Sequence, residues 1–379
     1  MKAHLSAILI MVFIAGFLSY SNAQETENTT AYDFNIVKEL PHTMAKDQGR
    51  AGTCWSFATT SFLESEIMRM GKDSVDLSEM FFVYHAYLDK AKRYIMRHGQ
   101  TNFSQGGQAH DVMNVIREEG MVPEKAYTGM AYEGTEHNHS EVVAMMHGML
   151  DKLAQQRNKM PLWIDAFRAV MDVYFGILPE NFEWKGKQIT AKAFQKSMGV
   201  NPDDYVELTS YEFYPYHTSV NLDIPDNWSF DYYYNVRLEE LIETIDYAIA
   251  EGYTVCWDGD VSEHGFNHGK GFAVLPTEDV LKDESYLNDI APEKEVTTDL
   301  REATFMSQES TDDHLMHLIG TSEDREGNPY YIIKNSWNHN SNDFQGKLHM
   351  SLPFVKAKTI AIMVHKDAVP KKLRKKLDF

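Results

Sequence analysis

The spacing of apolar residues changes once along this chain, near residue 205, and that change limits the folds open to it. Upstream, apolar residues recur at intervals of three and four, the period of a helix that buries one face, as in residues 138–200. Downstream, β-branched and aromatic residues gather in short runs typical of strands. A helical half followed by a sheet-rich half predicts an α+β fold, with a cleft between the halves as the natural place for chemistry.

The same patterns place individual elements. A long, largely buried helix is expected to begin near Cys54, a second helix is capped by Ser78, and a third ends at Gly120. A further helix is expected at 238–250, within the sheet-rich half. The predicted strands lie at 211–216, 232–236, 253–257, 316–321, 330–334 and 359–365.

The first 23 residues have the pattern of a secretory signal peptide. Lys2 precedes an apolar run from Leu5 to Leu18, and Ser21-Asn22-Ala23 supplies the small residues of a cleavage site. The run is too short for a comfortable membrane span. We therefore expect cleavage after Ala23 and an exported protein, periplasmic or extracellular, whose mature chain begins at Gln24.

Charge and cysteine content narrow the classes of protein further. A formal net charge of -20 disfavours nucleic acid and anionic membranes as partners, because phosphate groups are bound by clustered Lys and Arg. Only two cysteines are present, Cys54 and Cys256, so stability is expected to come from the core and not from a disulfide framework. A bridge between the two would silence any chemistry at Cys54.

The stretch Gln48–Ala58 carries the strongest chemical signal in the chain. A cysteine at a helix N-terminus feels the positive end of the helix dipole, which favours the nucleophilic thiolate at Cys54. The preceding glycines allow a sharp turn that brings backbone N–H groups towards a reacting carbonyl. Gln48, six residues upstream, can donate to an oxyanion. A histidine must supply the base, and with 16 histidines only a motif can identify it.

This stretch resembles the active-site block of papain-like cysteine peptidases, and two more blocks follow in the order that family requires. The first is Asp313-His314-Leu315-Met316, and the second is Tyr331-Ile332-Ile333-Lys334-Asn335-Ser336-Trp337. His314 lies 260 positions after Cys54, much farther than the roughly 130–150 of the papain type. The sequence is therefore most similar to the bleomycin hydrolase and aminopeptidase C branch, which has a helical insertion.

The resemblance implies a papain-like two-lobed fold and a role for each matched residue. Cys54 attacks the substrate carbonyl, His314 acts as base and then acid, and Asn335 accepts a hydrogen bond from the imidazole. Gln48 and the Cys54 backbone N–H form the oxyanion hole.

The resemblance implies supporting roles for three more residues. Trp337 would shield the Asn–His hydrogen bond from water. Gly106 and Gly107 would let an extended substrate backbone approach, although a plain turn is the alternative. His317 competes as the base, but in a strand it points to the opposite face from His314. Cys256 is expected to be structural.

The predicted organisation divides the chain into five parts. They are a signal peptide (1–23), a helical lobe carrying the nucleophile (24–137), a helical insertion (138–205), a sheet-rich lobe carrying His and Asn (206–368) and a basic tail (369–379).

This sequence differs from the bleomycin hydrolase and aminopeptidase C branch at its C-terminal end and at two positions beside the catalytic motifs. Only residues 366–379 remain after the last predicted strand, so the C-terminal arm that restricts these enzymes to free N-termini is expected to be missing. Asn338 stands where the family usually has glycine, and Leu315 where it has a small residue. An open cleft would then allow endopeptidase action.

The leading hypothesis is hydrolysis of peptide bonds through a thiolate acyl-enzyme, with no metal or organic cofactor. The alternatives are an open-cleft endopeptidase, an acyl transferase or amidase on the same fold, and a catalytically idle binding protein. The intact Cys, His, Asn and Gln set argues against the last. The expected partners are peptide substrates, and the resemblance implies a homo-oligomer, hexameric in that family.

Overall fold

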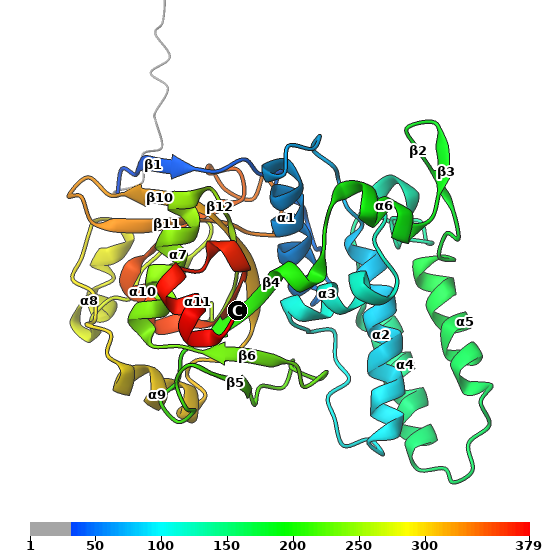
Figure 1. Ribbon diagram of the computed structural model, residues 1–379. Coiled ribbons are helices and arrows are strands. Elements are labelled where there is room, and N and C mark those ends of the chain that lie inside the picture. The colour runs from blue at the N-terminus through cyan, green and yellow to red at the C-terminus, as the bar shows by residue number, and fades with distance from the viewer. Residues whose placement is uncertain (1–31) are drawn as a thin grey trace, which may run out of the picture.

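The computed structural model describes residues 32–379, and a long mixed sheet organises their sheet-rich half (Figure 1). Its strands run in the order β5-β6-β4-β13-β7-β10-β11-β12-β9-β8, and β1 pairs with β10. They are β1 (Asn35–Glu39), β4 (Tyr205–Thr209), β5 (Thr218–Asn221), β6 (Tyr232–Asn235), β7 (Val255–Gly259), β8 (Phe266–Asn267), β9 (Phe272–Ala273), β10 (His314–Glu323), β11 (Pro329–Lys334), β12 (Lys347–Ser351) and β13 (Thr359–His365).

Helices of the first half pack around a separate apolar core. They are α1 (Cys54–Arg69), α2 (Glu79–Met96), α3 (Ala109–Glu118), α4 (Ser140–Ala154), α5 (Trp163–Phe175) and α6 (Ala191–Met198). Helix α1 is buried on nearly all sides because it packs against α2 and α3 on one side and against β10 and β7 on the other. It therefore joins the two halves, and Figure 1 shows it between them.

The sheet-rich half has its own helices and its own core. The helices are α7 (Leu238–Glu251), α8 (Glu278–Asp283), α9 (Thr298–Ser307), α10 (Leu352–Lys358) and α11 (Lys371–Leu377). Apolar residues of α7, α10 and α11 pack with the inner faces of β4, β7, β10 and β13. Figure 1 shows α7, α10 and α11 gathered on this side of the molecule.

The α+β prediction is confirmed, and most predicted strands coincide with observed ones. The strand expected at 211–216 is wrong: this segment is a turn between β4 and β5. Its aromatic residues resemble a strand in sequence, but Tyr211 and Phe213 stack on Phe305 of α9 instead of pairing through their backbones. His217 then adopts a φ of 60°, which a strand does not contain.

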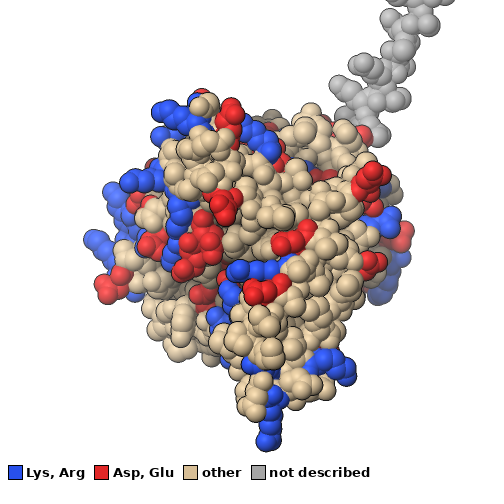
Figure 2. All heavy atoms as spheres, turned by 90° about the vertical axis from the view of Figure 1, so that its right-hand side faces the viewer, with Lys and Arg blue, Asp and Glu red and all other residues tan. Residues whose placement is uncertain are grey.

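The segment predicted as a helical insertion, 138–205, contains α4, α5 and α6 and also a hairpin of β2 (Phe182–Trp184) and β3 (Lys187–Ile189). Helices α4 and α5 pack against α2, so the segment extends the helical half. Figure 2 looks onto this side of the molecule and shows acidic and basic side chains interspersed. The net negative charge is therefore not concentrated on this face.

The sequence predicts a signal peptide at the N-terminal end and a basic tail at the C-terminal end. The predicted signal peptide lies outside the described residues. Within 32–379, no helix has the length and apolar character needed to cross a membrane. The basic tail forms α11, whose Leu373 and Leu377 are buried in the sheet-rich core, and the Phe379 ring packs on Tyr234. The last residue thus contacts β6 in the sheet-rich half.

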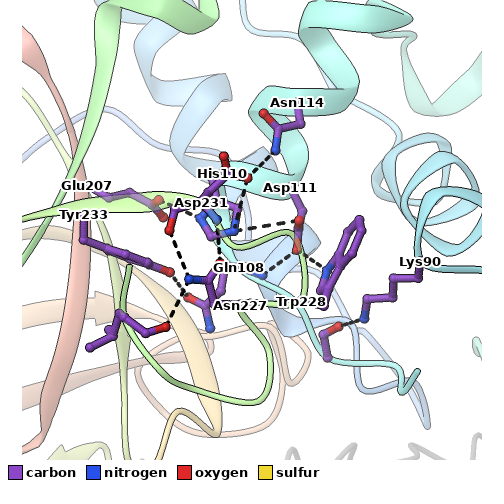
Figure 3. Close-up of polar contacts among 12 residues, drawn as sticks. Lys90, Gln108, His110, Asp111, Asn114, Glu207, Asn227, Trp228, Asp231 and Tyr233 are labelled. Carbon is purple, nitrogen blue, oxygen red and sulfur yellow. Dashed lines mark hydrogen bonds and ion pairs between the residues drawn. The ribbon is translucent and has the colours of Figure 1, made fainter. Parts of the chain in front are cut away.

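A buried ion pair links the two halves (Figure 3). His110 of α3 lies 2.7 Å from Glu207 of β4 through Nδ1. Burial lowers the pKa of His110, but the charge of Glu207 and their hydrogen bond outweigh it and raise the pKa to about 9. The imidazole is therefore protonated at neutral pH, and the pair fixes α3 against the sheet.

Candidate active site

Cys54 is the first residue of α1 and lies where the two halves meet. Its side chain is buried, and the backbone of Leu315 in β10 lies close enough to the sulfur to affect its pKa. Trp55 is fixed from the other side, since its indole N–H donates to the carbonyl of Gln105 at 3.0 Å. The nucleophile predicted from the sequence thus sits directly beside the strand that carries His314.

The turn before Cys54 needs glycine at one position. Gly49 has a φ of 60°, and a Cβ there would lie 2.7 Å from the carbonyl oxygen of His137. The next residue, Arg50, donates its backbone N–H to that same carbonyl at 2.7 Å. The turn that delivers Cys54 is therefore held by backbone contact with the segment before α4.

His314 begins β10, and its ring is oriented by Asn335. His314 Nε2 lies 2.8 Å from Asn335 Oδ1, which also accepts the backbone N–H of Ser336 at 2.7 Å. Because an amide oxygen can only accept, His314 must carry its proton on Nε2. That tautomer leaves Nδ1 free as a base.

A residue that the motifs did not single out completes this chain of hydrogen bonds. Asn335 Nδ2 lies 3.2 Å from His268 Nδ1, and His268 Nε2 lies 2.7 Å from Ser341 Oγ. The amide nitrogen can only donate, so His268 accepts there and fixes the orientation of the Asn335 amide. His268 follows β8 in a glycine-rich segment with no recognisable pattern, so only the fold brings it here.

Trp337 lies over the histidine as the resemblance implied. Its ring is 4.9 Å from that of His314 at an interplanar angle of 34°, and 5.1 Å from His268 in an edge-on arrangement. The indole thus covers the Asn–His contacts. Asn338, which follows, adopts a φ of 76°, a left-handed conformation that asparagine tolerates better than most residues, which explains how it replaces glycine there.

Gln48 is held by both halves of the molecule. Its Nε2 donates to Ala51 O at 2.8 Å, and its Oε1 accepts from Ser336 Oγ at 2.6 Å. The backbone adds a further link, since Gln48 N–H donates to Ser336 O at 2.9 Å. One amide N–H of Gln48 is committed to Ala51, and the second is available to a ligand.

Burial of Cys54 and His314 acts against the charged form of each group. Burial raises the pKa of Cys54 to about 12, and the charges of Asp226 and Asp258 act in the same direction. Burial also lowers the pKa of His314 to about 4, although the hydrogen bond that His314 donates to Asn335 acts in the opposite direction. Desolvation is the largest effect on both groups, and it opposes the positive end of the helix α1 dipole at Cys54.

The competing candidates lie elsewhere. His317 Nδ1 is 2.7 Å from Ser61 Oγ, two turns into α1 and away from Cys54. Cys256 is a free, buried thiol 3.5 Å from Thr59 Oγ1, also on α1. Neither joins the group around His314. Within residues 32–379, no cluster of three or more His, Cys, Asp or Glu side chains is arranged to hold a metal ion.

Gly106 and Gly107, the two glycines predicted to lie along the substrate backbone, are near the Trp55 ring that follows Cys54. The space beside Gly106 is partly occupied. A Cβ on Gly107 would lie 3.0 Å from the Trp55 ring, so glycine allows close packing there. At Gly106, the added Cβ would coincide with the Asp226 carboxylate, only 1.8 Å from Oδ2. Asp226 belongs to the segment between β5 and β6, and no motif indicated it.

Comparisons with known proteins agree with this geometry. A sequence model of the Peptidase C1-like family matches residues 6–379. The chain is 23% identical to aminopeptidase G of Lactobacillus delbrueckii subsp. lactis, over 88% of this chain and 83% of that protein. A cathepsin L-like proteinase of Fasciola hepatica is 29% identical over 31% of this chain and 33% of its own length. The crystal structure of PepW from Lactobacillus rhamnosis HN001 superposes with a TM-score of 0.73 at 18% identity, over 91% of this chain and 84% of that one.

Proposed function

Because this chain belongs to the Peptidase C1-like family and is therefore a cysteine peptidase, we propose that it acts as an aminopeptidase with Cys54 as its nucleophile. The observation that carries the assignment is the fixed tautomer of His314, set by Asn335 beside the residue at the start of α1. The sequence similarity to aminopeptidase G supports the choice of free N-termini as the substrate class. Export, which we propose from residues 1–23, predicts a mature chain that starts at Gln24.

The reaction uses the Cys54 sulfur as nucleophile and the His314 imidazole as its base. The Cys54 thiol proton moves to Nδ1 of His314 as sulfur bonds to the substrate carbonyl carbon, and the carbonyl oxygen becomes an oxyanion. The imidazolium then gives the proton to the leaving amine, and the C–N bond breaks. Water, deprotonated by the same nitrogen, hydrolyses the acyl-enzyme and restores the thiol.

The surrounding residues stabilise the charges that form in these steps. Asn335 accepts from Nε2–H throughout and so favours the imidazolium. The free amide N–H of Gln48 and the Cys54 backbone N–H donate to the oxyanion. Trp337 covers the His–Asn contact and keeps it from water.

Replacing Gln48 by alanine tests the oxyanion assignment. We expect the Gln48→Ala protein to lose about 100-fold or more in kcat with a much smaller change in KM, because the donor acts mainly in the transition state. Steady-state kinetics on an aminoacyl fluorogenic substrate measure both constants.

Ser336→Ala is the matched control for this test, since it removes the contact that anchors Gln48 Oε1 but leaves the amide donor in place. Its loss in kcat should be clearly smaller. An equal loss in the two variants would show that the amide acts by holding the two halves together and not by donating to the oxyanion.

A peptide ladder tests the aminopeptidase assignment itself. The protein, in reductant, is given peptides with free and with acetylated N-termini, with and without an epoxide that alkylates active thiols. We expect epoxide-sensitive loss of residues from free N-termini only. Epoxide-sensitive cleavage within acetylated peptides would replace the aminopeptidase with an endopeptidase.

Transfer to added amines in preference to water would favour an acyl transferase at the same site. The products with and without an amine acceptor therefore need to be identified by mass. Predominant hydrolysis in the presence of the acceptor supports the peptidase.

A further inference from the structure

Behind Asn335, a line of hydrogen bonds continues away from the reacting groups. His268, between β8 and β9, contacts Asn335 through Nδ1 at 3.2 Å and Ser341 through Nε2 at 2.7 Å. Ser341, between β11 and β12, contacts the backbone carbonyl of Asn338 at 2.6 Å. The line therefore joins two segments that follow different strands, and its other end is His314.

The direction of donation is fixed along this line. A carbonyl oxygen can only accept, so Ser341 donates its hydroxyl proton to Asn338 and offers lone pairs to His268. His268 must then donate from Nε2, which leaves Nδ1 without a proton in the neutral ring. That bare nitrogen is the acceptor that the Asn335 amide N–H requires. The neutral Nε2–H tautomer of His268 thus satisfies both of its neighbours.

The oxygen end of the Asn335 amide is held independently of His268. Oδ1 accepts from the backbone N–H of Ser336 at 2.7 Å as well as from His314 Nε2 at 2.8 Å. An amide turned end for end would place Nδ2, a donor, against both of these donors. The orientation that His314 needs is therefore the one that presents Nδ2 to His268.

A second proton on His268 is incompatible with this arrangement. Nδ1–H would face Nδ2–H of Asn335 across 3.2 Å, so two donors would meet where one donor now meets an acceptor. Asn335 must then turn over or move away, and in either case His314 loses the acceptor that fixes its tautomer. A charge on His268 also lowers the pKa of His314, which opposes the imidazolium that forms during the reaction.

The surroundings hold His268 in place and favour its neutral form. The Asn342 side-chain amide donates to the His268 carbonyl at 2.7 Å, and the Trp337 ring meets the imidazole edge-on at 5.1 Å. Burial lowers the pKa of His268. The titratable or charged side chains on the segments packed around it are His314 on β10, His339 and Asp343 after Trp337, Lys347 on β12, and His264 and Lys270 on its own segment.

We propose that His268 is a positioning residue for the peptidase reaction and that its protonation inactivates the site in acid. This inference rests on the proposed roles of Cys54 and His314 and adds the regulation of that site. Above the pKa of His268 the neutral ring holds Asn335, and below it the protonated ring releases Asn335. His268 therefore contributes to the loss of activity on the acid side of the pH profile.

Two replacements of His268 separate its role as an acceptor from its role in packing. In His268→Asn, the side-chain oxygen takes about the place of Nδ1 and accepts from Asn335, but it does not titrate. In His268→Leu, similar space is filled without an acceptor. We expect His268→Leu to lose about 10-fold or more in kcat on leucyl-amidomethylcoumarin with little change in KM, and His268→Asn to keep most of the native kcat at neutral pH.

The pH profile is the readout that packing alone would not change. Because kcat/KM reports the titrating groups of the free enzyme, we expect the acid limb of His268→Asn to lie about half a pH unit or more below that of the native protein. Coincident acid limbs in the two proteins would overturn the inference. Equal losses of kcat in His268→Asn and His268→Leu would also overturn it, because the imidazole would then only pack against Trp337.

His264→Asn and Ser341→Ala complete the set of variants. His264 is an exposed histidine on the same segment, so its replacement should leave kcat and the acid limb unchanged. Ser341→Ala removes the exposed hydroxyl that fixes the His268 proton on Nε2, and it serves if His268→Leu does not fold. We expect it to lower kcat severalfold in the native protein and to cost nothing more in His268→Asn, where that contact is already gone. Equal losses in the two backgrounds would contradict the line of hydrogen bonds.

The rate at which the epoxide alkylates Cys54 keeps this test independent of the substrate. If the native protein hydrolyses no aminoacyl substrate, the aminopeptidase assignment fails, and the alkylation rates of native protein and His268→Asn are still compared over the same pH range. An acid limb at lower pH in His268→Asn supports the inference. The same limb in both proteins overturns it, whatever the substrate of the enzyme.

Discussion

The Cys54→Ala protein should hydrolyse aminoacyl substrates at least about 10⁴-fold more slowly than the native protein, because the proposed acyl-enzyme forms on the Cys54 sulfur. His314 and its hydrogen bond to Asn335 do not depend on the sulfur, so the fold should be retained. The measurement is kcat/KM for leucyl-amidomethylcoumarin in reductant, with circular dichroism to confirm folding.

Cys256→Ala is the matched control, since it removes the only other thiol in the sequence. That sulfur contacts Thr59 within the core and takes no part in the arrangement around His314. The variant should keep its activity and still react once with the epoxide. Loss of activity in Cys256→Ala with retention in Cys54→Ala would reverse the assignment of the nucleophile.

The Arg301→Met protein should lose about 4 kcal/mol of unfolding free energy, through buried groups left unpaired. Arg301 of α9 is only 2% exposed, and its guanidinium donates to four backbone carbonyls of three different segments. These are the carbonyls of Ser210, Lys356, Ala357 and Thr359. Methionine fills similar space but gives none of them a donor, so the ends of β4, α10 and β13 lose a shared anchor.

Chemical denaturation followed by circular dichroism measures this loss. Arg157→Met is the control, because that arginine is exposed between α4 and α5 and its replacement should change the unfolding free energy little. Equal stability of the two variants would mean that water replaces the guanidinium at these carbonyls without cost.

Local patterns predict the parts of this site that belong to short continuous motifs. The turn before Cys54, the strand that begins at His314 and the Asn335–Trp337 segment each carry their chemistry within a few residues, and the structure brings them together. Composition cannot identify the catalytic base among 16 histidines. The position of His314 at the start of a motif-bearing strand can.

Residues that act through long-range contact give no such signal. His268 lies in unremarkable sequence, and only the fold of the chain places it beside Asn335. The aromatic turn at 211–216 resembles a strand for the same reason, because its packing partner Phe305 is far away in the sequence. A helix N-terminus likewise favours a thiolate at Cys54, whereas the burial that opposes the charge becomes visible only in the structure.

The link between Gln48 and Ser336 affects how this enzyme should respond to heat. The side-chain contact of 2.6 Å and the backbone bond of 2.9 Å join the strand-like lead into α1 to the segment after β11. If these two contacts between Gln48 and Ser336 break on warming, Gln48 moves away from the segment that carries Asn335. The oxyanion donor and the residue that orients His314 then separate in one event. Turnover would then cease at a temperature at which both apolar cores are still intact. A heated sample would lose its activity while its circular dichroism spectrum still showed a folded protein.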